Sequence, residues 1–157
     1  MRVRARTGLI LATSLPLLLT GCAPAMPAYS EVKESAIAAA QFVLAQLPSA
    51  SIEANPNSEP YACDAAGRRF TGEGLFYTGQ WLATLESGFD TEAFVKSLPA
   101  TAPPEFRVVD TGVATSWPSV DFTNGDEWIT VMTGIDDDGA PLVDVLVMSS
   151  CGRAEGE

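Results

Sequence analysis

The sequence predicts an α+β fold, a two-layer sandwich with two helices on one face of an antiparallel sheet of four or five strands. Three observations support it. Apolar residues recur at helical spacing after residue 30, a second and shorter helical segment follows residue 90, and the last third of the chain alternates apolar and polar residues between turn signals. Strands joined by tight turns run antiparallel, and helices covering one face of such a sheet complete the sandwich.

The first helix is expected to begin at Ser30 and to end before Pro48. Ser30 is a suitable N-cap, and Glu31 and Glu34 follow in the first turn, where the helix dipole favours acidic side chains. Proline then stops the helix. At 100° per residue one arc of this helix is apolar; it contains Val32, Ala36, Ile37, Ala39, Ala40, Val43, Leu44 and Leu47.

The middle of the chain is expected to form a long loop, one strand and a short helix. Residues 49–72 contain Pro, Asn, Ser and Gly without periodicity, which indicates a loop. From Glu73 the pattern alternates, which favours a strand over an aromatic-rich helix. Asp90 is then expected to cap a helix over residues 91–98, which Pro99 closes. The strand places four residues on one side: Tyr77, Gly79, Trp81 and Ala83.

The sequence of the C-terminal third predicts a meander of antiparallel strands. Asn124-Gly125 is a two-residue hairpin signal, and Asp136 to Gly139 make the next turn. The strands are expected at residues 106–115, 117–122, 127–133 and 142–149.

The last hairpin carries the candidate binding face. Val143, Val145 and Val147 share one face with Ile129 and Val131, and this face should meet the helices. The opposite face combines Thr130 and Asp144 with four large apolar residues. Such residue types are favoured at contact surfaces, so we expect a partner or ligand to bind there, unless the 49–72 loop covers this face or the two faces are reversed. The four residues are Trp128, Met132, Leu146 and Met148.

Residues 1–21 are expected to be an export signal. Arg2, Arg4 and Arg6 precede a short apolar run that ends in small residues. Leu19-Thr20-Gly21-Cys22 resembles the bacterial lipobox, and the resemblance implies that Cys22 is lipidated and becomes the first mature residue. Two acyl chains suffice for stable membrane anchoring. The expected organisation is a lipoprotein signal peptide (1–21), a tether (22–29), a single domain (30–151) and a disordered tail (152–157).

The number of cysteines, three, is consistent with an exported, lipid-anchored protein. An exported protein with an odd number of cysteines needs an explanation for the unpaired one, and lipid on Cys22 provides it. Cys63 and Cys151 then remain, in a compartment that permits a disulfide. Such a bond encloses 87 residues. The alternative is two separate buried thiols.

Composition excludes several classes of function. The formal charge is −11, and it becomes −14 once the signal is removed, which opposes nucleic-acid binding. The chain has no histidine, so it lacks the usual general base and the commonest zinc ligand. Asp136, Asp137 and Asp138 lack the EF-hand spacing and read as a turn rather than a calcium site. We therefore expect no metal and no cofactor.

Taken together, the segments resemble the small surface lipoproteins of actinobacteria. The resemblance rests on the helix after Cys22, on Cys63, on the aromatic strand with Tyr77 and Trp81, on the Asp90-led helix, and on the closing Ser149-Ser150-Cys151. It implies no catalytic residues. We expect a non-enzymatic interaction module, held by its N-terminal lipid on the extracytoplasmic face of the cell membrane and binding an envelope protein or small ligand. The alternatives are an extracytoplasmic carrier of a small ligand or lipid, and a carboxylate-dependent hydrolase of cell-wall glycan.

Overall fold

The computed structural model describes residues 25–48, 50–55, 60–63, 74–112 and 115–154. The expected signal peptide, Cys22 and the first residues of the tether lie outside this part of the chain. The described residues form two helices and eight strands. The helices are α1 (Tyr29–Leu44) and α2 (Thr91–Thr101). The strands are β1 (Ser51–Ala54), β2 (Tyr61–Ala62), β3 (Leu75–Phe76), β4 (Thr78–Thr84), β5 (Arg107–Val109), β6 (Ser119–Thr123), β7 (Trp128–Ile135) and β8 (Pro141–Met148).

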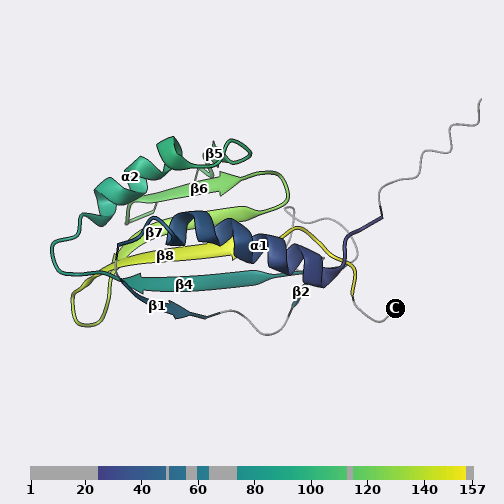
Figure 1. The fold of residues 1–157 in the computed structure, drawn as a ribbon, viewed down its shortest axis with the longest axis horizontal. Helices are drawn as coiled ribbons and strands as arrows, with labels where there is room; N and C mark the ends of the chain where they lie inside the picture. The colour runs from purple at the N-terminus through teal and green to yellow at the C-terminus, as the bar shows by residue number, and fades with distance from the viewer. Residues whose placement is uncertain (1–24, 49, 56–59, 64–73, 113–114, 155–157) are drawn as a thin grey trace, which may run out of the picture.

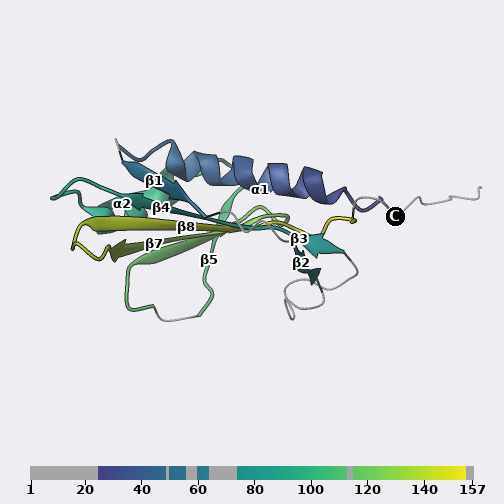
Figure 2. The same ribbon diagram turned by 90° about the horizontal axis from the view of Figure 1, so that it is seen from below.

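Six of the strands form one antiparallel sheet in the order β1-β4-β8-β7-β6-β5, and β2 pairs with β3 in a small hairpin. Both helices pack on the same face of the large sheet, α1 mainly over β8 and α2 over β7 and β6 (Figures 1 and 2). The predicted α+β sandwich is therefore confirmed, with a larger sheet than expected.

The core lies between the helices and the sheet. Ala36, Ala40 and Val43 of α1 are fully buried, as is Leu98 of α2. The small side chains of α1 let the helix approach β8 closely, because alanine adds little thickness to the interface. The sheet contributes Ala83, Ile129, Val131, Val143, Val145 and Val147, all fully buried.

The first helix begins differently from the prediction. Ala28, not Ser30, is the N-cap, and its backbone N–H donates to the Glu31 carboxylate over 2.8 Å. The reason is long-range: Ala28 pairs with Arg153 in a parallel bridge, which holds residue 28 in an extended conformation, so the helix begins immediately after it. The expected boundary between the tether and the domain moves accordingly.

The same pairing changes the C-terminus. Gly152 and Arg153 were expected in a disordered tail, yet Gly152 is buried and exchanges backbone hydrogen bonds with Leu75. A Cβ on Gly152 would lie 2.8 Å from Tyr29 Cα, so the chain ends approach each other as only glycine allows. The domain therefore extends to at least Arg153.

The expected loop over residues 49–72 contains two short strands. β1 pairs with β4 at the sheet edge, and β2 pairs with β3. Every residue of β1 is exposed, so the segment shows no alternation of buried and exposed positions. Pairing, rather than burial, makes it a strand.

The ends of α2 and β5 also differ from the prediction, for local reasons. α2 continues two residues past Pro99, because proline removes only its own N–H bond and Ala102 N–H still bonds to Leu98 O over 2.9 Å. The strand expected from residue 106 to 115 ends at Val109, where the Asp110 carboxylate accepts the Gly112 N–H and turns the chain.

The hairpin at Asn124 has four loop residues rather than two, because Thr123 pairs with Trp128. The Asn124 side chain accepts the backbone N–H groups of Asp126 and Glu127 and so stabilises the wider turn. The Asp136 carboxylate does the same in the last turn, accepting from Asp138 and Ala140. The aspartates of residues 136–138 therefore form a structural turn, as expected.

Candidate functional site

The two faces of the central hairpin differ as the sequence predicted. The side chains of Ile129, Val131, Val143, Val145 and Val147 are fully buried beneath the helices. The alternate residues point to the other side of the sheet, which we call the outer face. The prediction of which face meets the helices is confirmed.

Register brings the four candidate binding residues together on the outer face. Across β7 and β8, Trp128 pairs with Met148 and Met132 pairs with Asp144. Leu146 lies between Asp144 and Met148 on the same face of β8. All four side chains are half-buried. Both described helices lie on the opposite face, and the outer face is the lower side of the sheet in Figure 2, where the β2–β3 hairpin lies at one end.

Two further leucines belong to the outer face. Leu82 of β4 pairs with Asp144, and Leu142 pairs with Gly134. Their side chains are half-buried as well. The alternating pattern of residues 76–82 already placed Leu82 on the side opposite Trp81, but only the pairing of β4 with β8 shows that it joins the candidate residues. The outer face thus has six large apolar side chains.

Asp144 lies in the middle of these apolar residues. Its Oδ2 accepts a hydrogen bond from Gln80 Nε2 over 2.8 Å, while its Oδ1 is buried and has no hydrogen-bond partner in the described structure. Burial raises the pKa of this carboxyl, and the Gln80 hydrogen bond offsets part of the effect. The sequence placed Asp144 on this face but gave no sign that one oxygen would be unsatisfied.

Asp121 offers a contrast on the same face. It lies on β6 opposite Thr130, and its Oδ1 accepts from Thr130 Oγ1 over 2.5 Å and from Trp128 Nε1 over 3.2 Å. These bonds fix the indole of Trp128. The Oδ1 of Asp121 therefore has hydrogen-bond donors, whereas the Oδ1 of Asp144 is buried and has none in the described structure.

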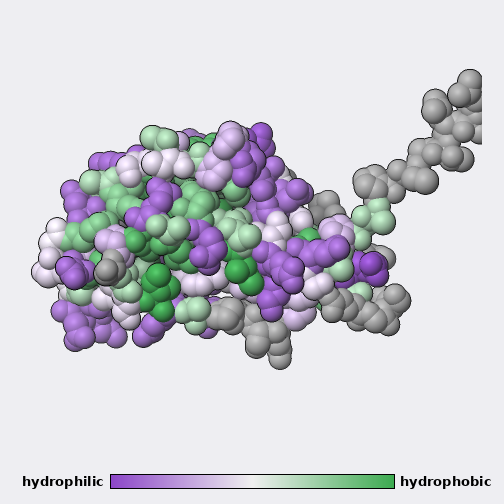
Figure 3. All heavy atoms as spheres, viewed as in Figure 1, coloured by the Kyte–Doolittle hydropathy of each residue, from purple (hydrophilic) through white to green (hydrophobic). Residues whose placement is uncertain are grey.

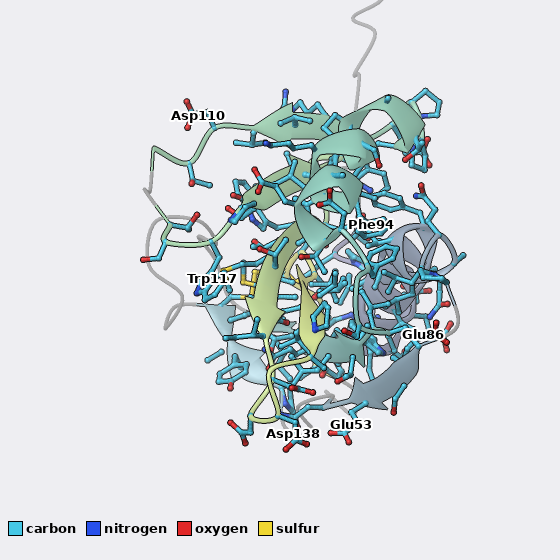
Figure 4. All side chains as sticks on the ribbon, turned by 90° about the vertical axis from the view of Figure 1, so that its left-hand side faces the viewer. Glu53, Glu86, Phe94, Asp110, Trp117 and Asp138 are labelled. Atoms are coloured by element: carbon cyan, nitrogen blue, oxygen red, sulfur yellow. A yellow bond between two sulfur atoms is a disulfide. The ribbon has the colours of Figure 1, made fainter. Side chains whose placement is uncertain are left out.

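The connection between β5 and β6 borders the outer face. It leaves the sheet on the side away from α1 (Figure 2), and Trp117 lies on that side (Figure 4). The Trp117 side chain is 45% exposed. An aromatic residue thus stands at the edge of the apolar face.

The helix side also has a groove. In Figure 3, which views this side, apolar side chains gather over and between α1 and α2, with hydrophilic ones around them. A cavity of about 240 Å³ lies between α1 and the β6–β7 turn, with Phe42, Phe106, Glu105 and Glu127 in its lining. Glu127 is buried, and its carboxylate accepts from Ser35 of α1 and from Asn124.

The Glu127 side chain therefore links α1 to the β6–β7 turn, because neutral donors from both elements bond to its two carboxylate oxygens. Glu105 and Glu127 are nevertheless two acids in one groove, the feature that a carboxylate-dependent hydrolase needs. A second cavity of about 380 Å³ is lined by the loop residues Pro48, Glu86, Ser87, Gly88 and Phe89.

Cys63 and Cys151 form the disulfide that the sequence predicted, with Cα atoms 6.1 Å apart. Cys63 is fully buried. The bond joins the β2–β3 hairpin to the segment after β8. β2 and the segment after β8 both lie at the end of the domain where α1 begins (Figure 1).

Within the described residues, no three metal-binding side chains come together, and neither helix is long and apolar enough to cross a bilayer. No family model, curated protein or solved structure was found to match the chain.

Proposed function

We propose that the protein is a lipid-anchored, non-enzymatic binding module of the cell envelope, and that its outer face contacts another extracytoplasmic protein. The lipobox-like segment and the disulfide support the location. The outer face supports the binding role.

One observation carries the proposal: six large, half-buried apolar side chains stand together on a sheet face that neither described helix covers. A sheet face turned to water is normally polar. A contiguous apolar patch of this kind marks an interaction site more often than a general surface. Trp128 and the two methionines are residue types enriched in the centres of interfaces.

The face also suits a protein better than a small ligand. A ligand carrier needs a concave pocket that buries most of the ligand. The outer face is a sheet surface, and the two described cavities lie elsewhere, on the helix side and among loops. A broad, partly apolar surface matches protein contact.

The binding role is tested by site-specific photo-crosslinking in the native host. A photoreactive residue replaces Leu146 on the outer face, and in a control protein it replaces Ala38, which is exposed on α1. We expect a discrete crosslinked product from position 146 that position 38 does not give. Loss of the product in a protein that also carries Met148→Ser would assign the contact to the outer face. No product from position 146, or the same product from both positions, contradicts the proposal.

The anchor is tested separately. Cys22→Ser should move the protein from the membrane to the soluble or secreted fraction, or leave it unprocessed, because the lipid attachment atom is lost. Ala23→Ser, one residue further on, is the matched control and should remain at the membrane. A Cys22→Ser protein that matures normally and stays membrane-bound contradicts the anchoring.

A further inference from the structure

One end of the domain lies within a short reach of the expected lipid anchor. The start of α1, the β2–β3 hairpin and residues 149–153 lie together at this end, which we call the anchor end (Figures 1 and 2). Pro27 O accepts the Arg153 N–H over 2.7 Å, so the folded domain begins at residue 27. Cys22 precedes Met26 by only four residues, which span at most about 14 Å when extended. A lipid on Cys22 would therefore hold the anchor end close to the bilayer surface.

Among the described residues, two large apolar side chains are exposed at the anchor end. Met26 is 41% exposed, and Tyr61 of β2 is 44% exposed. The Tyr61 ring stacks on the buried ring of Phe76, with the ring centroids 5.4 Å apart, so its position is fixed while much of it stays accessible. Tyrosine is enriched where lipid headgroups meet hydrocarbon, because its ring is apolar and its hydroxyl is polar. The exposed side chains at this end thus suit a lipid surface.

The hairpin that carries Tyr61 is tied to the rest of the anchor end. Gly74 O accepts the Cys63 N–H over 3.0 Å, and the disulfide between Cys63 and Cys151 joins the hairpin to the segment after β8. A Cβ on Gly74 would lie 3.2 Å from Met26 Sδ, so the Met26 thioether packs against the base of the hairpin. Lipid contact by Met26 and Tyr61 would therefore fix the orientation of the whole domain.

Resting on the lipid anchor of the proposed function, we propose that the anchor end docks on the bilayer that holds Cys22, with Met26 and Tyr61 inserted into the headgroup layer. The contact is apolar, because the mature chain carries a net charge of −14 and anionic lipid repels it. β8 runs from the opposite end of the domain to the anchor end (Figure 1), so in the docked state the central strands rise from the membrane surface. The outer face is then turned sideways, toward a neighbouring envelope protein.

The test uses the mature chain purified from membranes and reconstituted in phosphatidylcholine nanodiscs, with ¹³C-labelled methionine methyl groups. Removal of the signal leaves Met26, Met132 and Met148, and single substitutions assign their signals. Met26 lies at the anchor end and Met148 at the adjacent end of β8. Met132 pairs with Asp144, which is four residues or about 13 Å further from the anchor end along β8. One nanodisc preparation carries a nitroxide on the lipid headgroup, and a second carries it within the acyl chain.

We expect the acyl-chain nitroxide to broaden the Met26 signal strongly, the Met148 signal less and the Met132 signal hardly at all. Tyr61→Ser should weaken docking about tenfold and so reduce the Met26 broadening, because the variant loses the apolar ring. Ile135→Ser is the matched control: Ile135 is an exposed apolar residue at the opposite end of the sheet, and its loss should leave the broadening unchanged. An unchanged methyl spectrum without nitroxide shows that each variant keeps its fold.

The inference is overturned if the acyl-chain nitroxide leaves Met26 sharp, even where the headgroup nitroxide broadens it, because the anchor end would then stand off from the bilayer. Equal broadening of Met26 in Tyr61→Ser and in the wild-type chain also overturns it. Broadening of Met132 as strong as that of Met26 would lay the outer face on the bilayer and contradict both the docking and the proposed function. The fractionation of Cys22→Ser and the photo-crosslinking at position 146 decide the anchor and the binding role separately.

Discussion

The strongest stability prediction concerns the disulfide. Replacing Cys63 and Cys151 together by alanine removes a cross-link between residues 88 positions apart. A cross-link restricts the unfolded chain, and the loop-entropy relation gives about 4.5 kcal/mol at 25 °C for a loop of this length. Alanine is the suitable replacement because Cys63 is fully buried and a hydroxyl there would need a partner.

The free energy translates into a large thermal shift. A domain of about 125 residues has an unfolding entropy of roughly 0.26 kcal/mol/K, so the double variant should melt about 17 °C lower. Because ordinary domains have a total stability of about 5–15 kcal/mol, such a variant is only marginally folded. Calorimetry and urea unfolding of the purified chain measure both quantities.

Two comparisons make the measurement decisive. The wild-type protein under a strong reductant should match the double variant, because both lack only the cross-link. At low temperature, the double variant should fold to the same structure as the oxidised wild-type protein. A loss of stability below about 1 kcal/mol would refute the reasoning, since the covalent bond would then constrain little that the fold does not already hold.

Three further perturbations have smaller expected effects, each measurable by urea unfolding. Gly152→Ala should cost about 1–3 kcal/mol because its Cβ would lie 2.8 Å from Tyr29 Cα; an unchanged midpoint would show that the chain ends separate easily. Asp90→Ala should cost about 1 kcal/mol, since the carboxylate accepts the Ala93 N–H at the start of α2; no loss would mean that the cap is dispensable. Asp144→Asn should stabilise the protein at pH 7 and have little effect at pH 3. Burial raises the pKa of Asp144 above the value of about 3.9 for a free aspartate, so the folded state binds the proton more tightly than the unfolded state does. Wild-type stability therefore falls as the pH rises through this range. Equal effects of the substitution at both pH values would contradict this.

The parts of the fold that the sequence predicted are those set by burial. The alternation of Ile129 and Val131, and of Val143 to Val147, identified the covered face, because a strand buried on one side must alternate. The apolar arc of α1 likewise identified its buried residues, Val32, Ala36, Ala40, Val43 and Leu44 among them. Cys63 and Cys151 were predicted to pair because they are the two cysteines that remain once Cys22 is assigned to lipid.

The parts that could not be predicted depend on distant partners. β1 is exposed along its whole length and exists only because β4 offers an edge. Ser30 is a better cap residue than Ala28, yet the bridge to Arg153 decides where α1 begins. Asn124-Gly125 suggested a two-residue turn, but the pairing of Thr123 with Trp128 widened it.

The candidate site divides in the same way. Trp128, Met132, Leu146 and Met148 could be assigned to one face from alternation alone. The buried, unpaired Oδ1 of Asp144 could not be predicted, because it depends on Gln80 of β4 donating a hydrogen bond to Oδ2 only. Side-chain hydrogen bonding of this kind is decided by register and not by composition.

The bridge between the chain ends has a mechanical consequence. Tyr29 N–H donates to Arg153 O over 2.9 Å, and Arg153 N–H donates to Pro27 O over 2.7 Å. If the chain is tethered at its N-terminus, a pull on that tether passes at residues 27–29 into the segment that follows β8, a central strand of the sheet. The force is then distributed over α1 and the sheet, so the helix is not pulled away from the sheet on its own. The disulfide of the neighbouring Cys151 transmits part of the force to the β2–β3 hairpin.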